Sequence, residues 1–332
     1  MNIYDIANKS HVSIATVSRV INGSSNVSPE TRGKVLRTIQ EADYTPNAFA
    51  RGLGLNTMKQ IGILVSDVSD TCYANEVAVL ESSLQAAGFD VILKCTGTKL
   101  ESKRMMLNAM LECHVDAVIL VGSIMQELKG NSHIKAAAKK IPVIIINGYV
   151  KGKNIVNVRC NEKDGVQDCV HDMCHSGCQH LLLIYDHLTF SCKQKLAGFQ
   201  SGLLECKNYD PSPTGEAVCI SGNFDEIVIG AVQYLHNKSV DGIIGADDRV
   251  AVAVQKAMLR LGLSIPLVGM NNSILAKAAT PSISSIDNMS ETLCTIAVKN
   301  LLDVFQGKHV PCDTVVSSEF VERESFIRKN GE

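Results

Sequence analysis

The stretch VSIATVSRVING, residues 12–23, decides the fold of the N-terminal part of this chain. Ser13 can accept a hydrogen bond at the start of a helix, and Gly23 is the residue type that commonly follows a helix C-terminus. The sequence therefore predicts a helix over 14–22. Another helix is expected over 3–9, just before a tight turn. Two helices joined in this way indicate a helix-turn-helix unit.

A third helix is expected to brace this pair. Ser28-Pro29-Glu30 places a capping residue before a Pro at the first helical position, so a helix begins there and ends near Ala42. The turn between the first two helices carries His11, which tolerates the left-handed backbone region better than most residues. Apolar side chains from all three helices can close a small core: Val12, Val17, Val20, Val35, Leu36 and Ile39.

The charge of the chain is divided between this head and the rest. The 332 residues carry a net charge of −2, yet residues 1–60 hold seven Lys or Arg against four Asp or Glu. A basic head on an acidic body indicates a polyanionic partner for the head alone. The length exceeds twice the roughly 150 residues of a typical domain, so more than one core is expected.

The remainder of the chain alternates strands and helices. Amphipathic helical stretches such as 74–87 and 164–175 separate ten strand candidates: 61–65, 90–95, 117–121, 143–147, 155–158, 181–185, 217–220, 242–246, 267–270 and 283–286. This alternation is typical of parallel sheets covered on both faces. The strands divide near Cys160 into two halves. A helix over 291–306 and final strands within 314–321 are expected to return to them.

Composition predicts a cytoplasmic protein. The longest apolar run, near 141–146, is far shorter than the roughly 18 residues of a membrane span. The first residues lack the basic region and apolar core of a signal peptide. Twelve Cys are scattered along the chain without the regular spacing of a secreted disulfide framework, so reduced thiols are expected.

Nine stretches spread over nearly the whole sequence match one known family: 4–7, 12–23, 27–32, 44–53, 61–65, 141–143, 196–199, 281–286 and 319–325. In these stretches the chain resembles the lactose/galactose repressor (LacI/GalR-type) family of bacterial transcriptional regulators. The resemblance implies a small all-α helix-turn-helix head and an α/β body. The body would consist of two doubly wound parallel-sheet subdomains, as in periplasmic binding proteins.

The resemblance also implies domain boundaries. Residues 1–45 would form the DNA-binding head, 46–59 a hinge helix and linker, and 60–332 a core for effector binding and dimerisation. Within the core, the N-subdomain would take about 60–160 and 289–314. The C-subdomain would take about 161–288 and 315–330.

In this family the second helix of the head reads bases in the major groove. Its reading positions are matched here by Ile14 and Ala15, which suit thymine methyl groups, and by Arg19, which can pair with guanine. Other DNA contacts implied by the resemblance, mostly to phosphates, are Tyr4, Ser13, Thr16, Ser18, Asn22 and Thr31. Three more belong to the hinge, Asn47, Ala50 and Leu53, and the leucine would wedge between base pairs in the minor groove.

The same matching gives an effector pocket in the body. Its residues would be Tyr73, Ser123, Asn147, Asn161, Lys195, Phe224 and Asp248. The rings of Tyr73 and Phe224 would stack on the apolar face of a sugar or base, although both can instead be core aromatics. Lys195 stands where the family commonly has Arg, and Asp247 where Asn usually precedes Asp248. A sugar, a sugar phosphate or a similar metabolite is therefore expected.

One cluster matches no motif of the family: Cys169, His171, Cys174, His175, Cys178 and His180. If one helix continued through Cys178, two Cys and two His would share a stripe that suits tetrahedral zinc. Gly177 is expected to end that helix, and buried thiols beside exposed imidazoles are the simpler interpretation. No metal site or cofactor is assigned, and a metal- or redox-responsive regulator stays as an alternative.

These features predict a repressor whose affinity for a palindromic operator is controlled by a small molecule in the cleft of the core. A plain solute-binding protein is the rival, and the DNA-binding head argues against it. The sequence has no Walker loop, no Gly-x-Ser-x-Gly elbow and no Gly-x-Gly-x-x-Gly at a strand–helix junction, so no enzyme is expected. Without apolar heptads after residue 325, a homodimer is expected, with no membrane partner.

Overall fold

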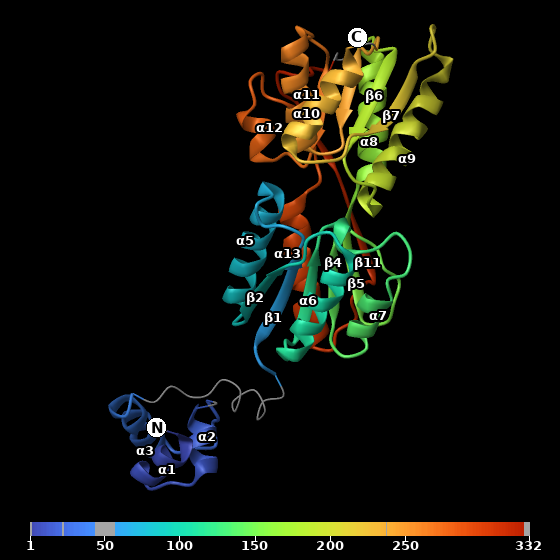
Figure 1. Ribbon diagram of the computed structural model, residues 1–332. Helices are drawn as coiled ribbons and strands as arrows, with labels where there is room; N and C mark the ends of the chain where they lie inside the picture. The colour runs from blue at the N-terminus through green and yellow to red at the C-terminus, as the bar shows by residue number, and fades with distance from the viewer. Residues whose placement is uncertain (1, 22, 44–56, 237, 329–332) are drawn as a thin grey trace. The chain divides into compact units, whose positions relative to one another are not determined.

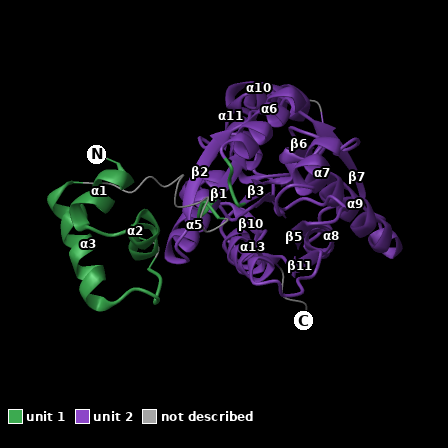
Figure 2. Cartoon of the chain, turned by 90° about the horizontal axis from the view of Figure 1, so that it is seen from below, with its two compact units in different colours: residues 1–60, 114–116 green, residues 61–113, 117–332 purple. Residues whose placement is uncertain are grey.

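The computed structural model of the chain describes residues 2–21, 23–43, 57–236 and 238–328. It forms two compact units, coloured separately in Figure 2. The first contains residues 1–60 with 114–116, and the second contains residues 61–113 with 117–332. Each unit has its own hydrophobic core. No helix in the described ranges is both long and apolar enough to span a membrane.

Three helices form the head: α1 (Ile3–Ser10), α2 (Ile14–Ile21) and α3 (Pro29–Glu41). A capping box starts α1, because the Asn2 side chain accepts from the Asp5 N–H and the Asp5 carboxylate accepts from the Asn2 N–H. His11 then ends α1 in the left-handed region, with φ at 50°. The sharp turn into α2 depends on this conformation.

The head core is small and apolar. Ile6, Ala7, Val17, Val20 and Val35 are buried in it, and Val12 and Ile39 pack against its edge. Leu36, which the sequence pattern places in this core, is 48% exposed. The expectation for Leu36 is wrong because Val35 and Ile39 share one face of α3, whereas the next residue along a helix is rotated by about 100°.

The first sheet of the body has six strands in the order β2-β1-β3-β4-β5-β11. The elements of this lobe are β1 (Gln60–Val65), β2 (Asp90–Cys95), β3 (Ala117–Val121), β4 (Val143–Ile146), β5 (Ile155–Asn161), β11 (Asp313–Ser317), α5 (Thr71–Ala86), α6 (Leu100–Glu112), α7 (Ser132–Ala138) and α13 (Ser290–Phe305). Ile61, Ile63 and Val65 face α5 and α13, whereas Gly62 lies against Met110 of α6. The sheet is therefore covered on both faces (Figure 1).

The second sheet repeats this plan in the order β7-β6-β8-β9-β10-β12. Its elements are α8 (Glu162–His175), β6 (His180–Tyr185), α9 (Phe190–Glu205), β7 (Thr214–Cys219), α10 (Phe224–Leu235), β8 (Gly242–Gly245), α11 (Asp248–Leu261), β9 (Leu267–Met270), α12 (Ile274–Ala278), β10 (Ser284–Asp287) and β12 (Glu319–Val321). Leu181 and Leu183 pack on α8 and α9, and Leu182 and Ile184 on α10 and α11. Only β12, among the paired strands described, runs antiparallel to its neighbour.

The predicted fold class, a helical head followed by two doubly wound sheets, is confirmed. One boundary differs from the expectation. β11 pairs with β5 of the first sheet as far as Ser317, and β12 joins the second sheet from Glu319. The chain therefore leaves the first subdomain after residue 317 rather than after 314.

Candidate functional site

The body contains a cavity of about 410 Å³ whose walls come from both sheets. In the first lobe, Ser66 follows β1, Ser123 follows β3 and Asn147 follows β4. In the second, Asp186 follows β6 and Asp247 lies just beyond β8. These positions are the carboxyl ends of parallel strands, where α/β folds bind ligands.

Lys195 of α9 lines the cavity and is buried. Its Nζ donates to the Ala246 carbonyl at 2.7 Å and lies 3.4 Å from Glu162 Oε1. Ser191 donates to the same carboxylate oxygen at 2.7 Å. Burial alone would lower the pKa of Lys195, but the charges of Glu162 and Asp247 outweigh it and raise that pKa. Lys195 is therefore charged, and its charge is already matched.

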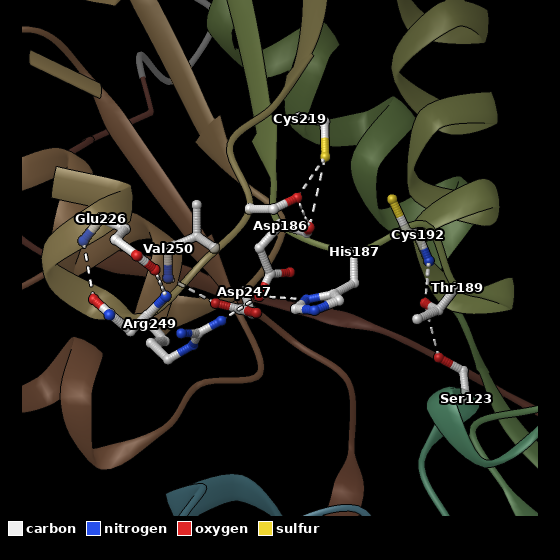
Figure 3. Close-up of polar contacts among 12 residues, drawn as sticks. Ser123, Asp186, His187, Thr189, Cys192, Cys219, Glu226, Asp247, Arg249 and Val250 are labelled. Atoms are coloured by element: carbon white, nitrogen blue, oxygen red, sulfur yellow. Dashed lines mark hydrogen bonds and ion pairs between the residues drawn. The ribbon is translucent and has the colours of Figure 1, made fainter. Parts of the chain in front are cut away.

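A second ion-pair cluster also lines the cavity, and its residues are drawn in Figure 3. Asp186 Oδ2 accepts from the Arg249 guanidinium and lies 2.9 Å from His187 Nδ1. Burial opposes ionisation of Asp186, yet His187 and Arg249 together lower its pKa. Asp247 caps α11 by accepting from the Val250 N–H at 2.7 Å. Burial and the charge of Asp186 raise the pKa of Asp247 to about 6.

The first turns of α5 supply an aromatic ring and a carboxyl group. The Tyr73 ring lies against Gly122, where a Cβ atom would come within 2.6 Å of Cε1, and where φ is +87°. Glycine is required there for both reasons. Glu76, also lining the cavity, is only 4% exposed, and its Oε2 has no hydrogen-bond partner. Burial, followed by the charges of Asp70 and Glu162, raises the pKa of Glu76 to about 8.

The two lobes touch at the rim of the cavity. Ser123 of the first lobe donates to Thr189 Oγ1 of the second at 3.0 Å (Figure 3). Thr189 also caps α9, accepting from the Cys192 N–H at 3.1 Å. The rings of Tyr149 and Phe190, again from different lobes, stack with centroids 6.4 Å apart. A change in the angle between the lobes would break these contacts.

Four of the seven predicted pocket residues line the cavity: Tyr73, Ser123, Asn147 and Lys195. Asn161, Phe224 and Asp248 do not line it. Asn161 donates to Asp164 at 2.6 Å on the outside of α8, and Phe224 packs on the α10–α11 core with Lys256 Nζ 5.4 Å from its ring. Asp248 is 1% exposed and accepts from Ser285 Oγ and the Ser273 N–H. The neighbouring Asp247 faces the cavity instead.

Several cavity residues were not predicted from the sequence, among them Glu76, Glu162, Asp186, Thr189 and Arg249. All lie just after a strand or in the first turns of a helix. That position, combined with a charged or hydroxyl side chain, is the signal that sequence alone offered. It does not say which of two adjacent residues faces inward.

The predicted recognition positions of the head lie on its surface. Tyr4 is 62% and Ile14 is 41% exposed, and Ala15 and Arg19 are exposed as well. Ser13 caps α2 by accepting from the Thr16 N–H at 3.1 Å, and Ser28 does the same for Thr31 at 3.3 Å. Ser18 is half-buried. Four further predicted DNA contacts lie outside the described residues: Asn22, Asn47, Ala50 and Leu53.

The cysteines and histidines of α8 do not form the zinc arrangement that their spacing allows. The helix ends at His175, and Gly177 follows with φ at 100°. Cys169, Cys174 and Cys178 are buried in an apolar core, whereas His171 lies 3.0 Å from Glu205. Among the residues described, no three His, Cys, Asp or Glu side chains are placed to hold a metal ion.

Comparison with known proteins agrees with both parts of this architecture. Residues 2–47 match the family described as bacterial regulatory proteins, lacI family, and residues 170–326 match the periplasmic binding protein-like domain. A curated HTH-type transcriptional regulator of Lachnoclostridium phytofermentans is 39% identical, with 98% of this chain and 99% of the relative covered. Catabolite control protein A of Priestia megaterium is 27% identical over 95% of this chain and 96% of its own.

Solved structures share the fold. The lac repressor dimer bound to operator and the anti-inducer ONPF has a TM-score of 0.84 at 23% identity, covering 98% of each chain. The CelR–cellobiose complex has a TM-score of 0.69 at 22% identity, covering 98% of this chain and all of its own. With its helix-turn-helix head, its two-lobed body and a near full-length relative at 39% identity, the chain belongs to the lacI family of DNA-binding transcriptional regulators.

Proposed function

We propose that this regulator is a homodimeric repressor whose operator affinity is set by a small effector bound in the cavity of the body. The observation that carries the proposal is the cavity itself, because both lobes supply its walls. A ligand there contacts both lobes at once, so it stabilises one angle between them over others. Among solved structures that share this fold, the lac repressor dimer is bound to operator and the anti-inducer ONPF, and CelR is in complex with cellobiose.

The head supplies the DNA-binding part of the proposal. Ile14 and Ala15 would contact thymine methyl groups, and Arg19 would pair with guanine. The phosphate contacts would come from Tyr4, Ser13, Thr16, Ser18, Asn22 and Thr31. Two equal heads of a twofold dimer require a near-palindromic operator. Such a protein catalyses no reaction and acts in the cytoplasm, where its DNA is.

A carboxyl group fixes the chain just before β1. Asp116, immediately before β3, accepts from the Thr57 hydroxyl at 2.9 Å and from the N–H groups of Met58 and Gln60 at 3.0 Å. Three hydrogen bonds to one side chain make a firm anchor. We place the DNA-contacting hinge and Leu53 in the segment 46–59, most of which precedes these hydrogen bonds in sequence.

Selection of bound DNA from a random duplex library tests the proposal, using the full-length protein. We expect an enriched inverted repeat. Thermal-shift screening would then identify small molecules that raise the melting temperature, since a ligand specific to the folded state stabilises it by an amount that grows with the logarithm of ligand concentration above Kd. Enrichment without inverted symmetry would contradict the twofold repressor. Ligands that bind the body but leave operator affinity unchanged would contradict effector control.

A further inference from the structure

The cavity between the two lobes carries surplus negative charge. Six carboxyl side chains line it, Asp67, Asp70, Glu76, Glu162, Asp186 and Asp247, of which Glu76 keeps its proton at neutral pH. Only two permanently cationic side chains among the described residues line it, Lys195 and Arg249. Such an imbalance attracts cations and repels anions, most strongly where low-dielectric walls limit screening.

Neither cation is available for a negatively charged ligand. Lys195 is held by Glu162, and Arg249 by Asp186. A phosphate group would have to displace one of these carboxylates and would still meet Asp70 and Asp247. Breaking a buried pair leaves an uncompensated charge, which is costly. The charges of this cavity therefore disfavour anionic ligands.

Glu76 provides an independent sign that a partner is missing. Its side chain is almost entirely buried, yet Oε2 accepts no hydrogen bond. Buried polar atoms without partners are uncommon and destabilising, so each one requires an explanation. The groups facing Glu76 cannot supply a cation: Asp70, Cys72 and Tyr73 come from α5, Glu162 from α8, and Cys294 from α13.

We propose that the effector of this cavity is a hydroxylated amine, such as an amino sugar, whose ammonium group is received by Glu76 and covered by the ring of Tyr73. A carboxylate beside an aromatic face is the arrangement that recognises ammonium groups in proteins. Ser123, Asn147 and Thr189 supply neutral polar groups for hydroxyls. This inference rests on the proposed function, in which the cavity is the effector site.

The protonation of Glu76 gives the proposal a distinctive signature. With its pKa raised to about 8 by burial, the carboxyl group keeps its proton at neutral pH. An ammonium ligand favours the ionised form, so binding releases this proton while the ligand itself remains protonated. Affinity for the amine therefore rises with pH up to the pKa of the ligand's own ammonium group and falls above it. Asp247, with a pKa raised to about 6, adds to the rise only in more acidic solution. A neutral sugar gains nothing from either ionisation.

The test compares matched ligands on the full-length protein by isothermal titration calorimetry. Glucosamine, glucose and glucose 6-phosphate form one series, and galactosamine, galactose and galactose 6-phosphate the other. In at least one series we expect the amine to bind about tenfold more tightly than the neutral sugar, and the phosphate to bind most weakly. Proton release, measured in buffers of different ionisation enthalpy, should accompany amine binding alone.

Glu76→Gln should abolish the preference for the amine and the released proton. Glu81→Gln, on the exposed face of the same helix, is the matched control and should change neither. The inference is overturned if no amine binds, or if the neutral or phosphorylated sugars bind as tightly as the amines. If a neutral sugar binds and lowers operator affinity, the amine proposal is wrong but the proposed function still holds. An amine that binds without changing operator affinity would instead reject effector control.

Discussion

Replacing Glu76 by Gln should make the body of this protein more stable, because the wild-type protein buries an unpaired carboxyl group there. In the unfolded chain this group has an ordinary pKa of 4.5, and burial raises it to about 8 in the folded protein. A carboxyl group whose pKa is raised by folding contributes least destabilisation below its unfolded pKa. The destabilisation grows as the pH rises from the unfolded pKa to the folded pKa, and it levels off above the folded pKa.

The size of the effect follows from these two values. At about pH 7 the folded protein must retain a proton that the unfolded chain has released, which costs about 1.4 kcal/mol per pH unit above the unfolded pKa, or roughly 3 kcal/mol. The buried amide of Gln keeps part of the desolvation cost. We therefore expect Glu76→Gln to raise the free energy of unfolding by about 1–3 kcal/mol at neutral pH. The gain should be larger near pH 8.5 and close to zero near pH 4.

Urea unfolding followed by circular dichroism at several pH values measures this. The comparison uses the midpoint of the body transition in wild type, Glu76→Gln and the exposed control Glu81→Gln. The midpoint of Glu76→Gln should exceed that of wild type by an amount that grows with pH, and Glu81→Gln should follow wild type. A Glu76→Gln protein no more stable than wild type at pH 8, or equally stabilised at pH 4, would refute the reasoning.

Three further predictions, one with a matched control variant, separate structural from functional roles. Arg19→Ala should cost about 1–3 kcal/mol of discrimination between operator and scrambled DNA in anisotropy titrations. The control Lys34→Ala should change the affinity for the two DNAs equally or not at all. Unchanged discrimination in Arg19→Ala would exclude a guanine contact by Arg19. Asp248→Ala should lower the free energy of unfolding by about 1–3 kcal/mol, because the Ser285 hydroxyl and the Ser273 N–H lose their acceptor. Altered ligand selectivity in this variant would show instead that Asp248 belongs to the effector site. Gly122→Val should displace the Tyr73 ring and weaken effector binding by about tenfold or more, and wild-type affinity would show that the ring does not contact the effector.

Local rules predicted the elements of the fold well. Ser13 and Ser28 cap helices in the head as expected, and His11 adopts the left-handed turn. In the body, short apolar runs such as 117–121 are strands because both of their faces are buried beneath helices. These features depend on neighbours in sequence, so a single chain displays them.

Side-chain direction was harder to predict because it depends on a single residue step. Asp247 and Asp248 are adjacent carboxylates at the start of α11, and only the first faces the cavity. The helix needs a capping side chain at its N-cap position, and Asp247 takes it. Asp248 then turns inward to Ser285. Leu36 in the head shows the same sensitivity, since one step along α3 separates it from the buried Val35.

Glu76 is a charged residue at a position where the helical pattern of α5 predicts an apolar one, and only the tertiary structure explains this exception. Leu80 and Leu84 form a buried stripe on α5 at a spacing of four residues, and Glu76 continues this stripe toward the helix N-terminus. Helical periodicity predicts an apolar residue at that position. The charged side chain is explained because α5 leaves the apolar core at its first turns and borders the cavity there. No local pattern reveals where that transition lies.

The carboxyl groups around this cavity also change the kind of ligand that the sheet topology would otherwise favour. In parallel α/β sheets the helices that follow the strands direct their N-termini at the crevice, and these ends usually attract phosphate groups. Here the N-caps of α5 and α11 are the side chains of Asp70 and Asp247, and the first residue of α8 is Glu162. The helix ends are thus satisfied by the protein's own negative charges. Of the effectors that the sequence allowed, a sugar phosphate is therefore the least compatible with this cavity, and a ligand that brings positive charge to Glu76 the most.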